Sequence, residues 1–235
     1  MVRRIVLSSV IVALTAIPVL SVADECTARY EALSTQHGQL NLAVNDRSAE
    51  AFVRDMVALE SAVFAAMQGC HNDARLLALM SELQLDLGQI PLATLYARKA
   101  VAADPGWWLA HHVLGVALSL GGQPAQGIEA LRRAARMAPD NPRVRLNLAS
   151  ALIRSERMDE ALPLIEQLTR ADCRRTAAAA YFLRGRWRLE QGKLPQARAD
   201  FVEAQRLGFS VERDLLPVEE AAPPLSGPGG ISPAR

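Results

Sequence analysis

Residues 108–141, WLAHHVLGVALSLGGQPAQGIEALRRAARMAPDN, place two helix-forming stretches on either side of a Gly-Gly turn. Each stretch contains a small residue, Gly115 in the first and Gly127 in the second. Small residues on facing helices let the two backbones approach closely, so the stretches can pack as a hairpin. Pro139 follows the second stretch and ends it, because proline cannot continue a helix. This segment therefore predicts a helical hairpin.

The same spacing recurs on both sides of this hairpin. Gly88 lies 34 residues before Gly122, and Pro105 lies 34 residues before Pro139. The small residue early in the second helix can be followed through four units, as Ala93, Gly127, Ala161 and Ala197. The last of these steps is 36 residues long, so two additional residues fall around 174–177. Because one hairpin cannot bury its apolar faces alone, the repeated units are expected to stack.

This pattern resembles the tetratricopeptide repeat over residues 74–211. That family has a large–small pair midway along the first helix, which this chain matches at Met80-Ser81, Leu114-Gly115 and Leu148-Ala149, and only in the small residue at Arg184-Gly185. The turn positions are Gly88, Gly122, Glu156 and Gly192, and the packing positions of the second helix are Ala97, Leu131, Ile165 and Phe201. The resemblance implies an all-α solenoid of four stacked helix-turn-helix units, at residues 74–107, 108–141, 142–175 and 178–211.

The residues before the repeats predict a helical hairpin of a different kind. Two helices are expected, at 25–37 and 47–68, and the second carries an apolar stripe of Phe52, Met56, Leu59, Val63 and Met67. Cys26 begins the first helix and Cys70 follows the second. In an antiparallel pair these ends lie side by side, so the sequence predicts a Cys26–Cys70 disulfide. Residues 24–73 are thus expected to form an N-terminal helical cap, and 212–235 a short cap followed by a disordered Pro/Gly/Ser-rich tail.

The first 23 residues have the pattern of a secretory signal peptide. Arg3 and Arg4 precede an uncharged apolar run at 5–20, and Ser21-Val22-Ala23 provides small residues at a cleavage site. We expect removal of residues 1–23 and a periplasmic or secreted location, where disulfides are permitted. The alternative is an uncleaved inner-membrane anchor, since the segment is nearly long enough to span a bilayer. The near-neutral charge favours neither nucleic acid nor a membrane surface as partner.

The sequence contains no motif that predicts catalysis, a metal or a cofactor. Its four histidines and three cysteines form no His-Glu-x-x-His, Cys-x-x-Cys or haem-attachment pattern. Cys173, left over from the predicted disulfide, is interpreted first as a buried small apolar residue, with a bond to a partner chain as the alternative. A thiol-dependent redox protein using Cys70 or Cys173 is a minor alternative.

The resemblance also implies a binding groove, which in this family is lined by first-helix side chains. The corresponding residues of this chain are Arg75, Glu82, Leu109, His112, Val116, Arg143, Leu146, Asn147, Ser150, Phe182 and Arg186. Their mixture suits an extended peptide or helix held by apolar contacts and arginine–carboxylate bonds. Some family members clamp a terminal carboxylate with Lys and Asn in the first repeat. Here Ala78 and Glu82 occupy those positions, so only Asn147 and Arg143 resemble the clamp.

These observations predict a non-catalytic protein that binds other proteins. Similar small exported repeat proteins act as scaffolds or adaptors in envelope complex assembly, secretion or pilus machines and cytochrome maturation. The alternative is a membrane-tethered, chaperone-like accessory of a translocation or maturation complex, with residues 5–23 kept as the anchor.

Overall fold

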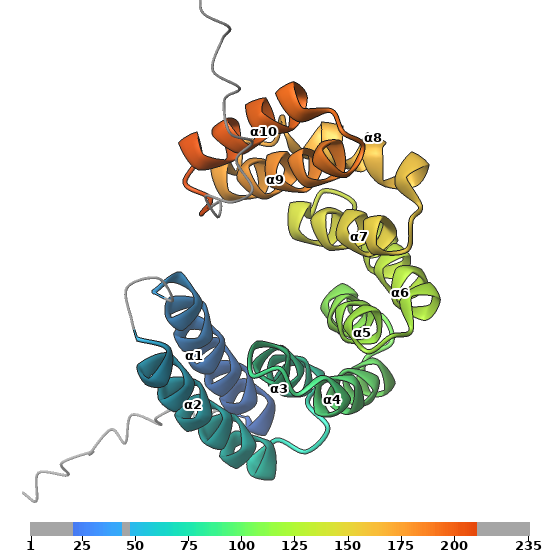
Figure 1. Ribbon diagram of the computed structural model, residues 1–235. Helices are drawn as coiled ribbons and strands as arrows, with labels where there is room; N and C mark the ends of the chain where they lie inside the picture. The colour runs from blue at the N-terminus through green and yellow to red at the C-terminus, as the bar shows by residue number, and fades with distance from the viewer. Residues whose placement is uncertain (1–20, 44–47, 211–235) are drawn as a thin grey trace, which may run out of the picture.

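The computed structural model describes residues 21–43 and 48–210, and over these ranges the chain forms α-helices and no strands. The helices are α1 (Val22–Leu42), α2 (Ala49–Gly69), α3 (Ala74–Asp86), α4 (Ile90–Ala103), α5 (Trp108–Leu120), α6 (Pro124–Met137), α7 (Pro142–Arg154), α8 (Met158–Leu168), α9 (Arg174–Glu190) and α10 (Leu194–Arg206). They stack as antiparallel pairs into an arc, with α1 and α2 at one end and α9 and α10 at the other (Figure 1). The predicted all-α solenoid is confirmed.

The curvature of the arc follows from which helices touch. Beyond its hairpin partner, α5 contacts both α3 and α7, and α7 also contacts α9. The even-numbered helices pack chiefly against their neighbours in sequence. Closer spacing of the odd-numbered helices bends the stack toward them, so α3, α5, α7 and α9 line its inner side (Figure 1).

The turn between the two helices of each unit uses a left-handed residue. Gly88, Gly122 and Gly192 have φ of 72°, 76° and 70°, and Glu156 adopts the same conformation at 58°. This conformation ends a helix by turning the next N–H back onto it. In the third unit, for example, the N–H of Arg157 donates to the carbonyl of Leu152 at 2.9 Å. The four predicted turn positions are therefore used as turns, including the one without glycine.

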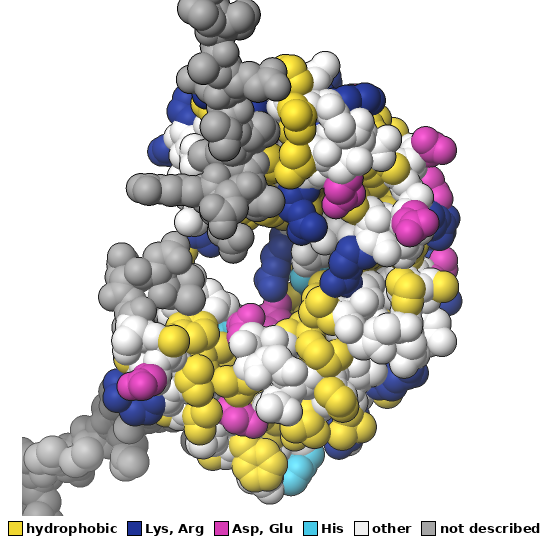
Figure 2. All heavy atoms as spheres, in the orientation of Figure 1, with side chains coloured by type: hydrophobic (Ala, Val, Ile, Leu, Met, Phe, Trp, Pro, Cys, Tyr) yellow, Lys and Arg dark blue, Asp and Glu magenta, His cyan; other side chains and the backbone are white. Residues whose placement is uncertain are grey.

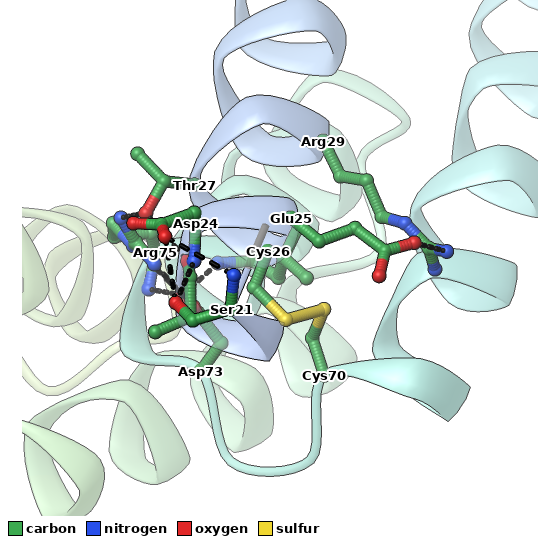
Figure 3. Close-up of a disulfide and its surroundings, with 11 residues drawn as sticks. Ser21, Asp24, Glu25, Cys26, Thr27, Arg29, Cys70, Asp73 and Arg75 are labelled. Carbon is green, nitrogen blue, oxygen red and sulfur yellow. Dashed lines mark hydrogen bonds and ion pairs between the residues drawn. A yellow bond between two sulfur atoms is a disulfide. The ribbon is translucent and has the colours of Figure 1, made fainter. Parts of the chain in front are cut away.

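The N-terminal hairpin is closed by the predicted disulfide. Cys26 of α1 and Cys70 at the end of α2 are bonded, with their Cα atoms 5.7 Å apart (Figure 3). Arg75 of α3 adds a second attachment, because its Nη1 donates to Thr27 Oγ1 of α1 at 2.7 Å (Figure 3). The cap is thus covalently closed and hydrogen-bonded to the first repeat.

Helix bounds differ from the predicted ones in α1 and α9. α1 continues to Leu42, five residues past the predicted end at 37. α1 begins at Val22, because Ser21 and Asp24 form a capping box in which each side chain accepts a hydrogen bond from the other's backbone N–H. α9 begins at Arg174, so the fourth unit starts before the expected residue 178, and the additional residues lengthen this helix. The predictions for residues 1–20 and for the tail at 212–235 lie outside the described residues.

A buried ion-pair cluster closes the C-terminal pair. Asp200 of α10 is only 2% exposed and lies between two arginines of α9. Arg184 Nη2 donates to Asp200 Oδ1 at 2.7 Å, and Arg188 Nη1 donates to Oδ2 at 2.8 Å. This cluster explains why Arg184 replaces the large apolar residue of the repeat pattern.

We expect Asp200→Ala to lower the free energy of unfolding by about 3 kcal/mol, because it leaves the Arg184 guanidinium enclosed without its carboxylate. The measurement is chemical denaturation followed by circular dichroism. Glu203→Ala, which removes an exposed ion pair with Arg206 on the same helix, is the matched control. That control should cost less than about 0.5 kcal/mol. Similar losses in both variants would contradict the structural role of Asp200.

Candidate functional site

Side chains from four odd-numbered helices converge on one hollow at the centre of the inner side. This inner hollow has a volume of about 240 Å³. It is lined by His37, Asn41, Glu82, Leu85, Asp86, His112, Val113, Val116, Leu120, Arg143 and Asn147. Figure 2 shows acidic side chains on one wall of the space enclosed by the arc and basic ones on the opposite wall. Five of the predicted groove residues, Glu82, His112, Val116, Arg143 and Asn147, thus come together here.

An ion pair bridges the inner hollow from the first repeat to the third. Arg143 Nη2 of α7 lies 2.5 Å from Glu82 Oε1 of α3. The two partners differ in exposure, since the side chain of Glu82 is 11% exposed and that of Arg143 is 58% exposed. Arg143 therefore already has a carboxylate partner inside the protein and does not form the open clamp suggested by the resemblance.

His112 of α5 lies in the same hollow, is 1% exposed, and is held in its neutral form. Burial, and next the positive charge of Arg143, lower the pKa of His112 to about 3. Asn147 Nδ2 lies 2.7 Å from His112 Nε2 and donates to it, which assigns the ring proton to Nδ1. Nδ1 is buried and has no hydrogen-bond partner.

The N-terminal cap supplies the far wall of the inner hollow, which the sequence did not predict. His37 Nε2 of α1 donates to Asp86 Oδ2 at 2.7 Å, and its Nδ1 lies 3.9 Å from Glu82 Oε2. Asn41 also donates to Asp86, at 3.2 Å. Asp86 follows Glu82 by one helical turn and so shares its face of α3, a signal that was available in the sequence. The contribution of α1 had no such signal.

The other predicted groove residues lie outside the inner hollow. Arg75 pairs with Asp73 and Thr27 at the start of α3, and Leu109 is buried in the core between the first two units. Leu146 packs against the core of the third unit, and Ser150 is half-buried on α7. Phe182 stacks on Phe209 with ring centroids 4.6 Å apart, and Arg186 is exposed, 3.9 Å from Glu190.

Cys173 is not a buried apolar residue, which corrects the preferred interpretation of the sequence. It is exposed and unpaired, because it precedes α9 as the N-cap and not as the end of a packed helix. A hydrogen bond with Thr176 lowers the pKa of its thiol. Cys70 is in the disulfide, so the redox alternative depends on Cys173 alone.

The buried neutral His112 predicts a loss of stability in acid. Its pKa is about 3 in the folded chain against an ordinary 6.5, so below pH 6.5 the unfolded chain takes up a proton that the folded chain does not. The free energy of unfolding should then fall by about 2 kcal/mol between pH 7 and pH 5 from this group. His112→Gln should remove that part of the pH dependence, measured by denaturant titration at each pH. His71→Gln, at an exposed histidine, should leave it intact.

The described part of the chain offers no metal site and no membrane span. Within residues 21–43 and 48–210, no group of three His, Cys, Asp or Glu side chains is placed to hold a metal ion. None of the helices in those ranges is long and apolar enough to cross a bilayer.

Comparison with known proteins agrees with the repeat pattern. Two tetratricopeptide-repeat family models match residues 78–142 and 120–184. None of the curated proteins matches the chain significantly. Three solved structures have the same fold. A thermophilic TPR protein of Thermus thermophilus has 21% identity and a TM-score of 0.57, covering 74% of this chain and 91% of its own. MamA has 19% identity and a TM-score of 0.53, with coverages of 67% and 91%.

The third structure is YrrB, a TPR protein described as having an unusual peptide-binding site. It has 17% identity and a TM-score of 0.52, and the match covers 81% of this chain and 96% of YrrB. At these identities the three structures support the fold alone. Together with the stacked helix pairs, they show the fold, and the family matches show that residues 78–184 are similar to tetratricopeptide repeats.

Proposed function

We propose that the chain is a non-catalytic scaffold that binds another protein along its inner side. Tetratricopeptide repeats imply protein partners. The observation that carries the proposal is the inner hollow, where Glu82, His112, Arg143 and Asn147 of three successive units meet. Because no single unit could build this site, it exists only when the units are stacked.

An exported adaptor is the more specific form of this proposal. The basic-apolar-small pattern of residues 1–23 and the Cys26–Cys70 disulfide support a periplasmic or secreted location. There the protein would serve envelope complex assembly, a secretion or pilus machine, or cytochrome maturation. Sequencing the N-terminus of the purified protein tests this form. Asp24 as first residue supports export with cleavage, whereas Met1 supports the membrane-tethered alternative.

Affinity capture with charge-altered variants tests the binding surface. On the inner side, Arg186→Glu alters an exposed residue of α9 and Ser150→Arg alters a half-buried residue of α7. Arg136→Glu on α6, whose side chain is 65% exposed, is the control on an even-numbered helix. The two inner variants should lose proteins that the wild type captures from envelope extracts, and the α6 variant should keep them. Equal capture by all variants would show that the inner side does not bind the partner.

A further inference from the structure

The inner hollow contains more fixed negative charge than its own arginine uses. Glu82 and Asp86 project from adjacent turns of α3, and both line the hollow. Arg143 pairs with Glu82 only, and Asp86 is hydrogen-bonded by His37 and Asn41. The hollow therefore has two carboxylates and one guanidinium. His37 contacts both carboxylates, and the neutral ring of His112 also lines the hollow.

Displacing Arg143 from its ion pair with Glu82 costs less free energy than displacing Glu82 from the same pair. Glu82 is almost enclosed, so removing its cation without a replacement would leave a desolvated carboxylate. Arg143 has a long side chain that is more than half exposed, so it can move into water at little cost. A cation that displaces Arg143 therefore leaves every charge satisfied. An anion that displaces Glu82 does not.

The remaining walls of the inner hollow are aliphatic. Leu85, Val113, Val116 and Leu120 also line it, although Val113 itself is fully buried. Lysine and arginine side chains combine an apolar stem with a charged tip, which matches aliphatic walls leading to a carboxylate.

Building on the proposed function, we propose that the inner hollow binds a lysine or arginine side chain of the partner protein, which replaces Arg143 on Glu82. The partner thus presents a basic side chain flanked by apolar ones, and Arg143 acts as an internal competitor that holds the site in its unbound form. Charge complementarity with Glu82 and Asp86 selects this occupant over an acidic segment.

Two pools of terminally blocked, fluorescein-labelled nonapeptides test this assignment. The pools are randomised over Leu, Val, Ser and Gly and differ only in a central Arg or a central Glu. Binding to the full chain is measured by fluorescence anisotropy at low salt. The Arg pool should bind at least about tenfold more tightly than the Glu pool, because the charge pair forms in a largely enclosed site.

Variants test separately the role of Arg143 as competing cation and the role of Glu82 and Asp86 as the carboxylates that bind the partner's side chain. Glu82→Gln and Asp86→Asn should each weaken binding of the Arg pool, the first by about tenfold or more. Arg143→Gln should strengthen it about threefold or more, because the internal competitor is gone. A gain confined to the Arg pool cannot be explained by a damaged fold, which would bind both pools alike. Glu129→Gln on α6, whose carboxylate is exposed, is the matched control and should change nothing.

Three results would overturn the proposal. The first is tighter binding of the Glu pool than of the Arg pool, with that binding lost in Arg143→Gln. The others are equal binding of both pools to the wild type, and weaker binding of the Arg pool to Arg143→Gln than to the wild type. These results leave the scaffold function standing if capture of the partner still depends on Arg186 and Ser150. If capture is independent of those inner residues, the scaffold surface itself is wrong.

Discussion

Gly127→Val is expected to lower the free energy of unfolding by about 4 kcal/mol, because α5 and α6 touch through their backbones at this point. A Cβ atom on Gly127 would lie 2.7 Å from the carbonyl oxygen of Gly115 and 2.8 Å from the backbone N of Ser119. Neither backbone atom can move aside without separating the helices. Even Gly127→Ala should cost about 2 kcal/mol, although alanine improves helix propensity by about 1 kcal/mol.

The measurement for Gly127 is denaturant unfolding followed by circular dichroism. Gly38→Ala is the control, since a Cβ there meets nothing within 4 Å and the residue lies inside α1. That variant should be stabilised by about 0.5–1 kcal/mol. Because units of a solenoid contact only their neighbours, separation of α5 from α6 should also split unfolding into two transitions. A Gly127→Val protein with wild-type stability would show that the helices can adapt.

The hairpins were predictable because each position that recurs from unit to unit reflects a local structural requirement. The predicted turn position is a turn even at Glu156, which adopts a left-handed φ of 58° where the other units have glycine. Spacing also placed the disulfide, because antiparallel helices of similar length bring their opposite ends together. These features depend on residues close in sequence or on one hairpin geometry, so periodicity was sufficient.

The sequence predicted a close approach at Gly115 and Gly127 but did not indicate that the space excludes even an alanine side chain. Ala93, Ala161 and Ala197 occupy the position of Gly127 in the other units, which suggests that alanine is acceptable there. Only the structure shows that two facing glycines bring this pair of helices too close for any side chain. The close fit depends on the two residues that face each other in one unit, and not on the residue types that the repeat position accepts in the other units.

The candidate site was predictable in part for a similar reason. Family positions identified Glu82, His112 and Arg143 as inner residues, and the structure places them in one hollow. Nothing in the sequence indicated that Arg143 would pair with Glu82, 61 residues away, or that α1 would contribute His37. Such pairings depend on the curvature of the stack, which accumulates over several units and has no local signature.

Replacing both cysteines of the disulfide, in Cys26→Ser/Cys70→Ser, is expected to destabilise the N-terminal hairpin by about 4 kcal/mol. The bond closes a loop of 44 residues, and the lost constraint on the unfolded chain accounts for a free energy of this size. The effect should be largest in α1 and α2 and should not reach the far end of the stack, because each hairpin of a solenoid depends only on its neighbours. Hydrogen exchange resolved by peptide should show faster exchange there and unchanged exchange in α7–α10.

Cys173→Ser is the control for this double variant, since its thiol is exposed and unpaired. It should leave stability and exchange as in the wild type. The disulfide also supports the candidate site, because α1 holds His37 and Asn41 against Asp86 at the wall of the inner hollow. Loss of the bond should therefore weaken partner capture while α3, α5 and α7 stay folded. If the double variant exchanges like the wild type throughout, the contacts of Arg75 and His37 hold the cap without the bond.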